Sequence, residues 1–197
     1  MLDFLHQLFS HVCGQNLAHT WSPGGELLPC CQRCTGVYVG AFVAALLHLA
    51  RRPQPTSFWR WLNGAFLLFM VPSGFYWIPQ NPELRAASGI LFGSGLVAFL
   101  WLPLPGKFTI CDLRFTTKNH ERRVNRKSQI VNALVLLATL IFTPLLGTSE
   151  NSLAATALAL LTAGGALALA LLLAADFSLA ACGLWRWFFQ PAPRVAA

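Results

Sequence analysis

Five stretches of mostly apolar residues run through this chain and constrain its fold more than any other feature. They cover about residues 36–50, 59–78, 86–103, 130–146 and 153–175. A helix that spans a bilayer needs roughly 20 apolar residues, with a range of about 17 to 25. The last four stretches meet or approach this length, whereas the first is short unless the residues before it lie at membrane depth.

Inside a bilayer each of these stretches has to form a helix, because other lipid-exposed backbone would lack hydrogen-bond partners. The composition agrees, since charged residues make up only 11% of the chain, against about 25% in an average soluble protein. The sequence therefore predicts an all-α fold, a polytopic membrane helix bundle of about five transmembrane helices. A Cys-rich interfacial segment precedes the first of them.

We expect a single membrane domain over residues 1–197. Residues 1–35 form an exterior Cys/His segment, and residues 36–105 hold spans one to three. Residues 106–128 form a basic cytoplasmic loop, and residues 129–197 hold spans four and five with the C-terminal tail. The first residues, "MLDFLHQLFSHVC", lack the basic region of a signal peptide and predict a short amphipathic helix at the interface.

The basic residues indicate the orientation. Under the five-span interpretation, twelve of the fourteen Lys and Arg residues lie on one side of the membrane, and such residues mark the cytoplasmic side. An odd number of spans then places the N-terminus outside, so we expect a multi-pass protein of the bacterial inner membrane. The net charge of +7 follows from this topology, so the lipid bilayer is an expected partner and nucleic acid is not.

Cysteines gather in the exterior segment, at Cys13, Cys30, Cys31 and Cys34. "CQRC" is a C-x-x-C motif that leads directly into the first apolar stretch, and the turn "SPGGE" can fold Cys13 back toward it. His11 and His19 lie on either side of Cys13. Three kinds of chemistry fit this pattern.

The first is a metal site with Cys13, Cys31, Cys34 and His11 as ligands, and with Cys30 or His19 as substitutes. A C-x-x-C turn supplies two neighbouring thiolates, and a further Cys with a His completes tetrahedral coordination. Soft sulfur ligands suit zinc, copper or an iron–sulfur centre.

The second is thiol–disulfide exchange. A cysteine at the start of a helix has a lowered pKa, and Arg33 adds a positive charge between Cys31 and Cys34. The third is structural, because a disulfide from Cys13 to one of the other cysteines would tie the exterior segment to span one. A scaffold or assembly subunit would carry such a bridged flap.

Small residues suggest how the helices pack. Gly36 and Gly40 in span one, and Gly89 and Gly93 in span three, recur at i, i+4, a spacing that lets another helix approach closely. Packing of span one against span three is the simplest use, and a homodimer or a membrane-protein partner is the alternative.

The motifs "FSHVCGQ" and "LPCCQRCTGVYVG", with "NPELRAASGILFGSG" further on, resemble a known signature. It belongs to bacterial and archaeal membrane proteins catalogued as domain of unknown function 2085, and the likeness covers roughly residues 9–105. Residue by residue, the resemblance points to these positions: Cys13, Gln15, Cys31, Arg33, Cys34, Thr35, Gly36, Tyr38, Gly40, Asn81 and Arg85. Gly14 stands where the family has a His, so a ligand role of that His is lost here or passes to His11 or His19.

The family name supplies no reaction, and the sequence does not decide whether the protein is an enzyme. We interpret the chain as a membrane protein with an exterior Cys/His metal site, with Gln15 and Arg33 beside it. The alternatives are a membrane thiol–disulfide oxidoreductase and a structural subunit. Arg33 would lie close enough to the site to bind an anion or a lipid phosphate.

Overall fold

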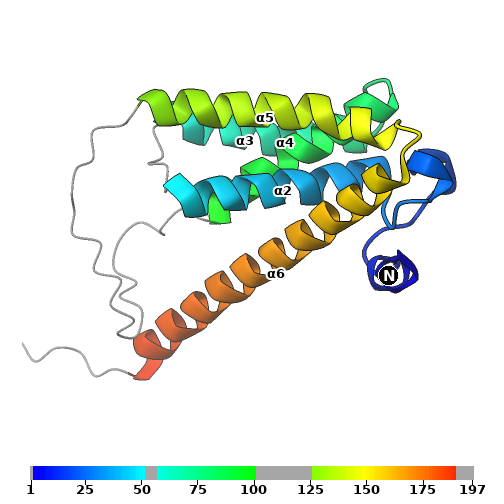
Figure 1. The fold of residues 1–197 in the computed structure, drawn as a ribbon. Helices are drawn as coiled ribbons and strands as arrows, with labels where there is room; N and C mark the ends of the chain where they lie inside the picture. Colours follow the sequence, from blue (N-terminus) through cyan, green and yellow to red (C-terminus); the bar gives the residue numbers. More distant parts are fainter. Residues whose placement is uncertain (1, 52–56, 101–125, 190–197) are drawn as a thin grey trace, which may run out of the picture.

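The computed structural model describes residues 2–51, 57–100 and 126–189, and every regular element in these ranges is helical (Figure 1). A short helix, α1 (Leu2–Phe9), and two 3-10 turns, η1 (Leu17–His19) and η2 (Pro23–Gly25), come first. The long helices that follow are α2 (Gln32–Arg51), α3 (Ser57–Gly74), α4 (Pro82–Leu100), α5 (Arg126–Gly147) and α6 (Ser152–Phe189). The predicted all-α membrane helix bundle is confirmed.

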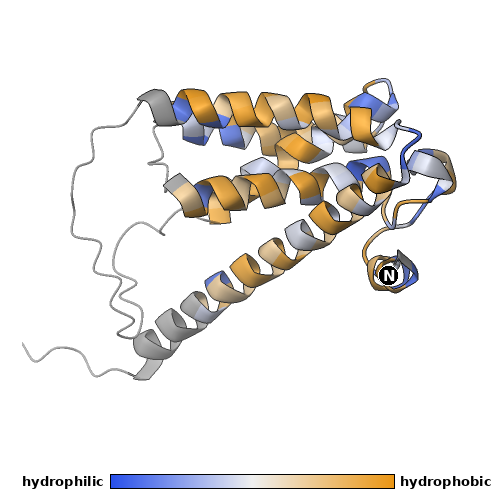
Figure 2. Cartoon of the chain, viewed as in Figure 1, coloured by the Kyte–Doolittle hydropathy of each residue, from blue (hydrophilic) through white to orange (hydrophobic). Residues whose placement is uncertain are grey.

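Among the described residues, four helical segments are long and apolar enough to cross a membrane: Gln32–Ala50, Pro82–Leu100, Gln129–Gly147 and Ser152–Ser178. Helix α3 falls outside this set because Arg60 and Asn63 lower its hydropathy. It still runs antiparallel to α2 and α4, since it connects these two parallel helices in sequence, and it packs against α4. Its 18 residues extend for about 27 Å. Figure 2 shows apolar residues along the long helices and polar ones gathered near the helix ends and connections.

Helices α2 and α4 form the most extensive helix contact and run parallel. Gly36 lies against the carbonyl of Ala86, and Gly40 lies against that of Ile90. In return, Gly89 and Gly93 lie against carbonyls of α2. A Cβ atom at any of these four glycines would overlap backbone, so only glycine permits the two helices to approach this closely.

Helix α6 packs on another side of α2, where Gly165 lies against the carbonyl of Tyr38. Among the α6 side chains whose burial the structure describes, the buried ones, which include Ala155, Leu158 and Thr162, belong to the first half of the helix. Figure 1 shows α6 crossing the bundle obliquely, so that its C-terminal half diverges from α2. The helix has 38 residues, about 57 Å, and continues beyond residue 175, where the fifth span was expected to end.

Several sequence-based expectations fall outside the described residues. Of the basic loop predicted over residues 106–128, the part up to position 125, which includes Cys111, is outside the described residues. Residues 190–197 of the predicted C-terminal tail are outside them as well. Helix α2 begins before Gly36, the predicted start of span one, because Gln32 and Arg33 already take helical conformation. The C-x-x-C motif therefore begins one residue before a membrane helix and continues into its first turn.

We expect Gly93→Ala to destabilise the bundle by about 1–3 kcal/mol or more, because the added methyl would overlap the backbone carbonyl of Val37. Thermal unfolding of the purified protein in detergent measures this. Gly74→Ala is the matched control, since a Cβ there meets no atom within 4 Å. Equal melting temperatures for the two variants would contradict the close contact.

Candidate metal centre

The first turn of α2 brings two cysteines to one side of the helix. Cys31 immediately precedes α2, and Cys34 follows three residues later, a spacing that places side chains on the same face. The amide of Thr35 donates to the carbonyl of Cys31 (2.9 Å), and the Thr35 hydroxyl donates to the carbonyl of Cys30 (3.3 Å). These bonds hold the Cys30–Cys31 link against the helix start.

The N-terminal segment delivers the third cysteine. After α1 the chain turns, with the amide of Cys13 donating to the carbonyl of Phe9 (2.8 Å). Phe9 is only 2% exposed, and its ring packs on that of Tyr38 at 5.3 Å between centroids. This aromatic contact fixes the turn, and with it Cys13, beside α2.

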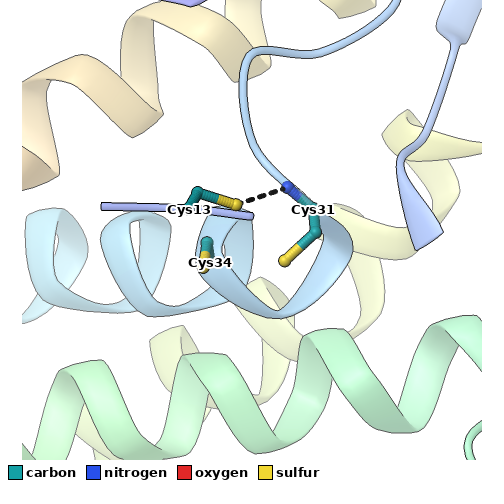
Figure 3. Close-up of side chains that lie close together, drawn as sticks. All are labelled: Cys13, Cys31 and Cys34. Carbon is teal, nitrogen blue, oxygen red and sulfur yellow. Dashed lines mark hydrogen bonds between the residues drawn. The ribbon is translucent and has the colours of Figure 1, made fainter. Parts of the chain in front are cut away.

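Three sulfur atoms converge at this point. The Sγ atoms of Cys13, Cys31 and Cys34 all lie within 4.8 Å of one another, and all three residues are free thiols. Figure 3 shows Cys13 entering from the N-terminal segment and the other two from the start of α2. The amide of Cys31 donates to the Cys13 sulfur (3.4 Å), so a backbone dipole also stabilises negative charge there.

The spacing fits one thiophilic ion. Tetrahedral zinc, with Zn–S distances of about 2.3 Å, places its sulfur ligands about 3.8 Å apart. The cysteine sulfurs are therefore within a short adjustment of that arrangement. Cys13 is buried while Cys31 and Cys34 are half-buried, so the group has an apolar inner wall and an open outer side.

Cys30 is a fourth sulfur at the site. It is 1% exposed, and its thiol hydrogen-bonds to the Cys13 sulfur. Hydrogen bonds from Cys30, then Cys31 and Cys34, hold the pKa of Cys13 well below its usual range. The same bond, together with burial, raises the pKa of Cys30. Among these cysteines, the contacts therefore favour loss of the proton from Cys13 over loss from Cys30.

The two histidines lie apart from the three converging sulfurs. His11 is exposed, and its Nδ1 donates to the carbonyl of Gln7 (3.1 Å). His19 belongs to η1, which has no buried residues. Gly14 has open space around its Cβ position, so a Cβ atom there would meet no neighbouring atom.

Gln15 acts as a clamp for the N-terminal segment. Its side-chain amide donates to the carbonyls of His6 (2.7 Å) and Pro29 (3.0 Å), while His6 donates to the carbonyl of Leu27 (3.0 Å). These bonds join α1 to the residues just before the C-x-x-C motif. The structure thus gives Gln15 a positioning role, with its amide nitrogen bonded to backbone.

Arg33 reaches the end of α3 and the α3–α4 connection. Its Nη2 donates to the carbonyl of Ser73 and to Oε1 of Gln80, both at 2.8 Å. Sequence reasoning missed Ser73, Ser88 and Gln80, since isolated polar residues in apolar stretches carry no motif. Ser73 and Ser88 are buried polar residues within helices, and this is the signal that could have found them, whereas Gln80 lies in the α3–α4 connection.

A known protein family matches the part of the chain that contains the cysteine group. The model of the family described as "Predicted membrane protein (DUF2085)" matches residues 13–99. An uncharacterized protein of Methanothermobacter thermautotrophicus is 30% identical over 95 residues, which cover 48% of this chain and 83% of that protein.

The chain belongs to the DUF2085 family. The match begins at Cys13 and ends at Phe99, so it contains the four cysteines and the helices α2, α3 and α4, and omits α1, α5 and α6. No solved structure matches the chain.

We expect Gln15→Ala to loosen the N-terminal segment, because two carbonyls lose their common donor. Alkylation of Cys13 by a maleimide, followed by peptide mass spectrometry, should become about tenfold faster, which corresponds to roughly 1.4 kcal/mol. Gln7→Ala, at an exposed position of the same segment, serves as the control. Unchanged labelling of Cys13 in the Gln15 variant would refute the clamp.

Proposed function

We propose that this DUF2085 protein binds a single thiophilic metal ion, zinc or copper(I), at Cys13, Cys31 and Cys34. The convergence of three free sulfurs within 4.8 Å carries the proposal. An iron–sulfur centre fits less well, because its irons bind separate cysteines around a larger inorganic core. The bound ion would join the N-terminal segment to α2.

Cys30 is the fourth ligand that the contacts favour. Its thiol already hydrogen-bonds to the Cys13 sulfur, whereas His11 is exposed and bonded to its own helix. A site of four thiolates would be a closed, structural one, whereas three thiolates leave a position open for exchange or transfer. Metal binding releases the protons of the thiols, so the affinity should rise with pH.

A membrane thiol–disulfide oxidoreductase is the second candidate. Cys31 and Cys34 are half-buried, close together and at the start of a helix. In that reaction the two thiols would form a disulfide, and a substrate disulfide would take up the two electrons and two protons. A bridged structural flap draws less support, because all four cysteines are free.

For the setting, we propose the bacterial inner membrane with the cysteine group outside. The group lies where α2, α4 and α6 begin, and the basic connections after α2 and α4 leave from the opposite end. Lys and Arg favour the cytoplasmic side. Exposed apolar side chains along α5 and α6, such as Leu137, Ile141 and Leu167, suit contact with lipid.

Metal analysis tests the main proposal. The protein purified in detergent should contain about one equivalent of zinc or copper, and Cys31→Ser/Cys34→Ser should lose it, because two of the ligands are gone. Cys30→Ser distinguishes two forms of the site. If four sulfurs bind the ion, this variant should lose at least about tenfold in metal affinity. If only three bind it, the affinity should be retained. Cys182→Ser, far along α6, is the control and should retain the metal.

Absence of metal, even after incubation with excess zinc or copper(I), would refute the metal site. If the thiols then become titratable only after reduction, the oxidoreductase gains support. The wild type should in that case reduce a model disulfide, and Cys31→Ser/Cys34→Ser should not.

Orientation has its own test. In intact spheroplasts a membrane-impermeant maleimide should label Cys31 and Cys34 from outside, and Cys111 only after permeabilisation. Single-cysteine variants allow each position to be scored. The reverse pattern would place the N-terminus in the cytoplasm.

A further inference from the structure

Arg85 is a buried cation on a membrane helix. It lies in the first turn of α4, and its side chain is 5% exposed. Its Nε and Nη1 atoms are buried and have no hydrogen-bond partner among the described residues. A buried charge without a partner is strongly destabilising, and ionisable groups within membrane-spanning segments usually serve a function.

A second arginine, Arg33, lies on the neighbouring helix α2. Gly89 lies against the carbonyl of Arg33, and Gly36 lies against the carbonyl of Ala86. The turn of α2 that carries Arg33 is therefore in backbone contact with the turn of α4 that carries Arg85. Arg33 uses its Nη2 for Ser73 and Gln80, while its Nε is buried and unpartnered within the described part of the chain.

Hydrogen bonds between α3 and α4 hold the surroundings of both arginines in place. The Ser73 hydroxyl donates to that of Ser88 (3.0 Å), which donates to the carbonyl of Arg85 (2.9 Å). This chain of bonds fixes the end of α3 to the start of α4. Within the described ranges, no carboxylate pairs with the unpartnered nitrogen atoms of Arg33 or Arg85.

The helix directions add to the positive potential. Because α2 and α4 are parallel, both N-termini lie at this end of the bundle, and a helix N-terminus favours anions. The helix N-termini add a favourable potential for an anion, and the buried Arg85 side chain supplies the hydrogen-bond donors.

We propose that Arg85, together with Arg33, binds a phosphate group at the N-terminal ends of α2 and α4. The planar fork of N–H donors in a guanidinium matches two phosphate oxygens. The first turns of membrane-spanning helices lie near the level of lipid headgroups, so the phosphate could belong to a phospholipid or to a soluble phosphate. The chemistry that the arginines recognise is the same in both cases.

The test is ligand-dependent thermal stability of the full-length protein, purified in phosphate-free detergent buffer. One arm adds inorganic phosphate, with sodium chloride of equal ionic strength as the reference. The other adds phosphatidylglycerol in mixed micelles, with a phosphate-free diacylglycerol as the reference. At about ten times the dissociation constant, the melting temperature of the wild type should rise by about 3 °C or more.

Arg85→Gln should abolish the rise, because it removes the charge and the donor fork. Arg60→Gln is the control, since Arg60 is an exposed arginine in α3 and should leave the rise intact. If Arg85→Gln does not fold, Arg85→Lys retains the charge without the fork and should weaken binding at least about tenfold. Bound phosphorus per protein, determined on wild type and Arg85→Lys, gives a second readout.

A rise with inorganic phosphate identifies a soluble ligand, and a rise with phosphatidylglycerol alone identifies a lipid headgroup. No rise of the wild type above the reference in either arm overturns the proposal, and so does an equal rise in Arg85→Gln. These measurements do not involve the cysteines, so they can fail or succeed independently of the metal site.

Discussion

The contact between α2 and α4 is the constraint on which the rest of the structure depends. Glycines on both helices allow backbone to touch backbone, which is how membrane helices gain packing energy where lipid is as apolar as the side chains. This contact sets the parallel direction of α2 and α4, so α3, which connects them in sequence and packs on α4, has to run in the opposite direction. It also brings the start of each helix to one end, where the cysteines and the two arginines lie.

The end of the bundle where α2 and α4 begin thus holds two polar groups, the cysteines and the arginines, on different sides of α2. The cysteine group faces α1 and the beginning of α6, as its contacts with Phe9, Tyr38 and Ala159 show. Arg33 instead reaches Ser73 and Gln80 on the side of α3. Cys34 and Arg33 are neighbours in sequence, and the helical turn sends their side chains apart. Arg33 was expected beside the cysteine site because it is adjacent to Cys34 in the sequence, but its side chain bonds to Ser73 and Gln80 instead.

Much of this arrangement follows from the sequence. Long apolar stretches predicted the helices, and the match to the DUF2085 family agrees with the likeness in the cysteine motif. Helix limits were less accurate: α2 begins at Gln32 and α6 continues to Phe189, because hydropathy shows what lies in lipid and not where helical hydrogen bonding stops. The clamp by Gln15 and the network through Ser73 and Ser88 depend on tertiary packing, which no local pattern encodes.

The cysteine group is assembled from two segments, and this has a thermodynamic consequence. Cys13 reaches α2 only when the N-terminal segment is docked through Phe9 and Gln15. Any ligand that needs all three sulfurs binds the docked form alone, so occupancy and docking are linked equilibria. Each tenfold excess of free ligand over its dissociation constant then adds about 1.4 kcal/mol to the docked state. The first residues of the chain would behave as a latch whose closed population reports the concentration of the ligand.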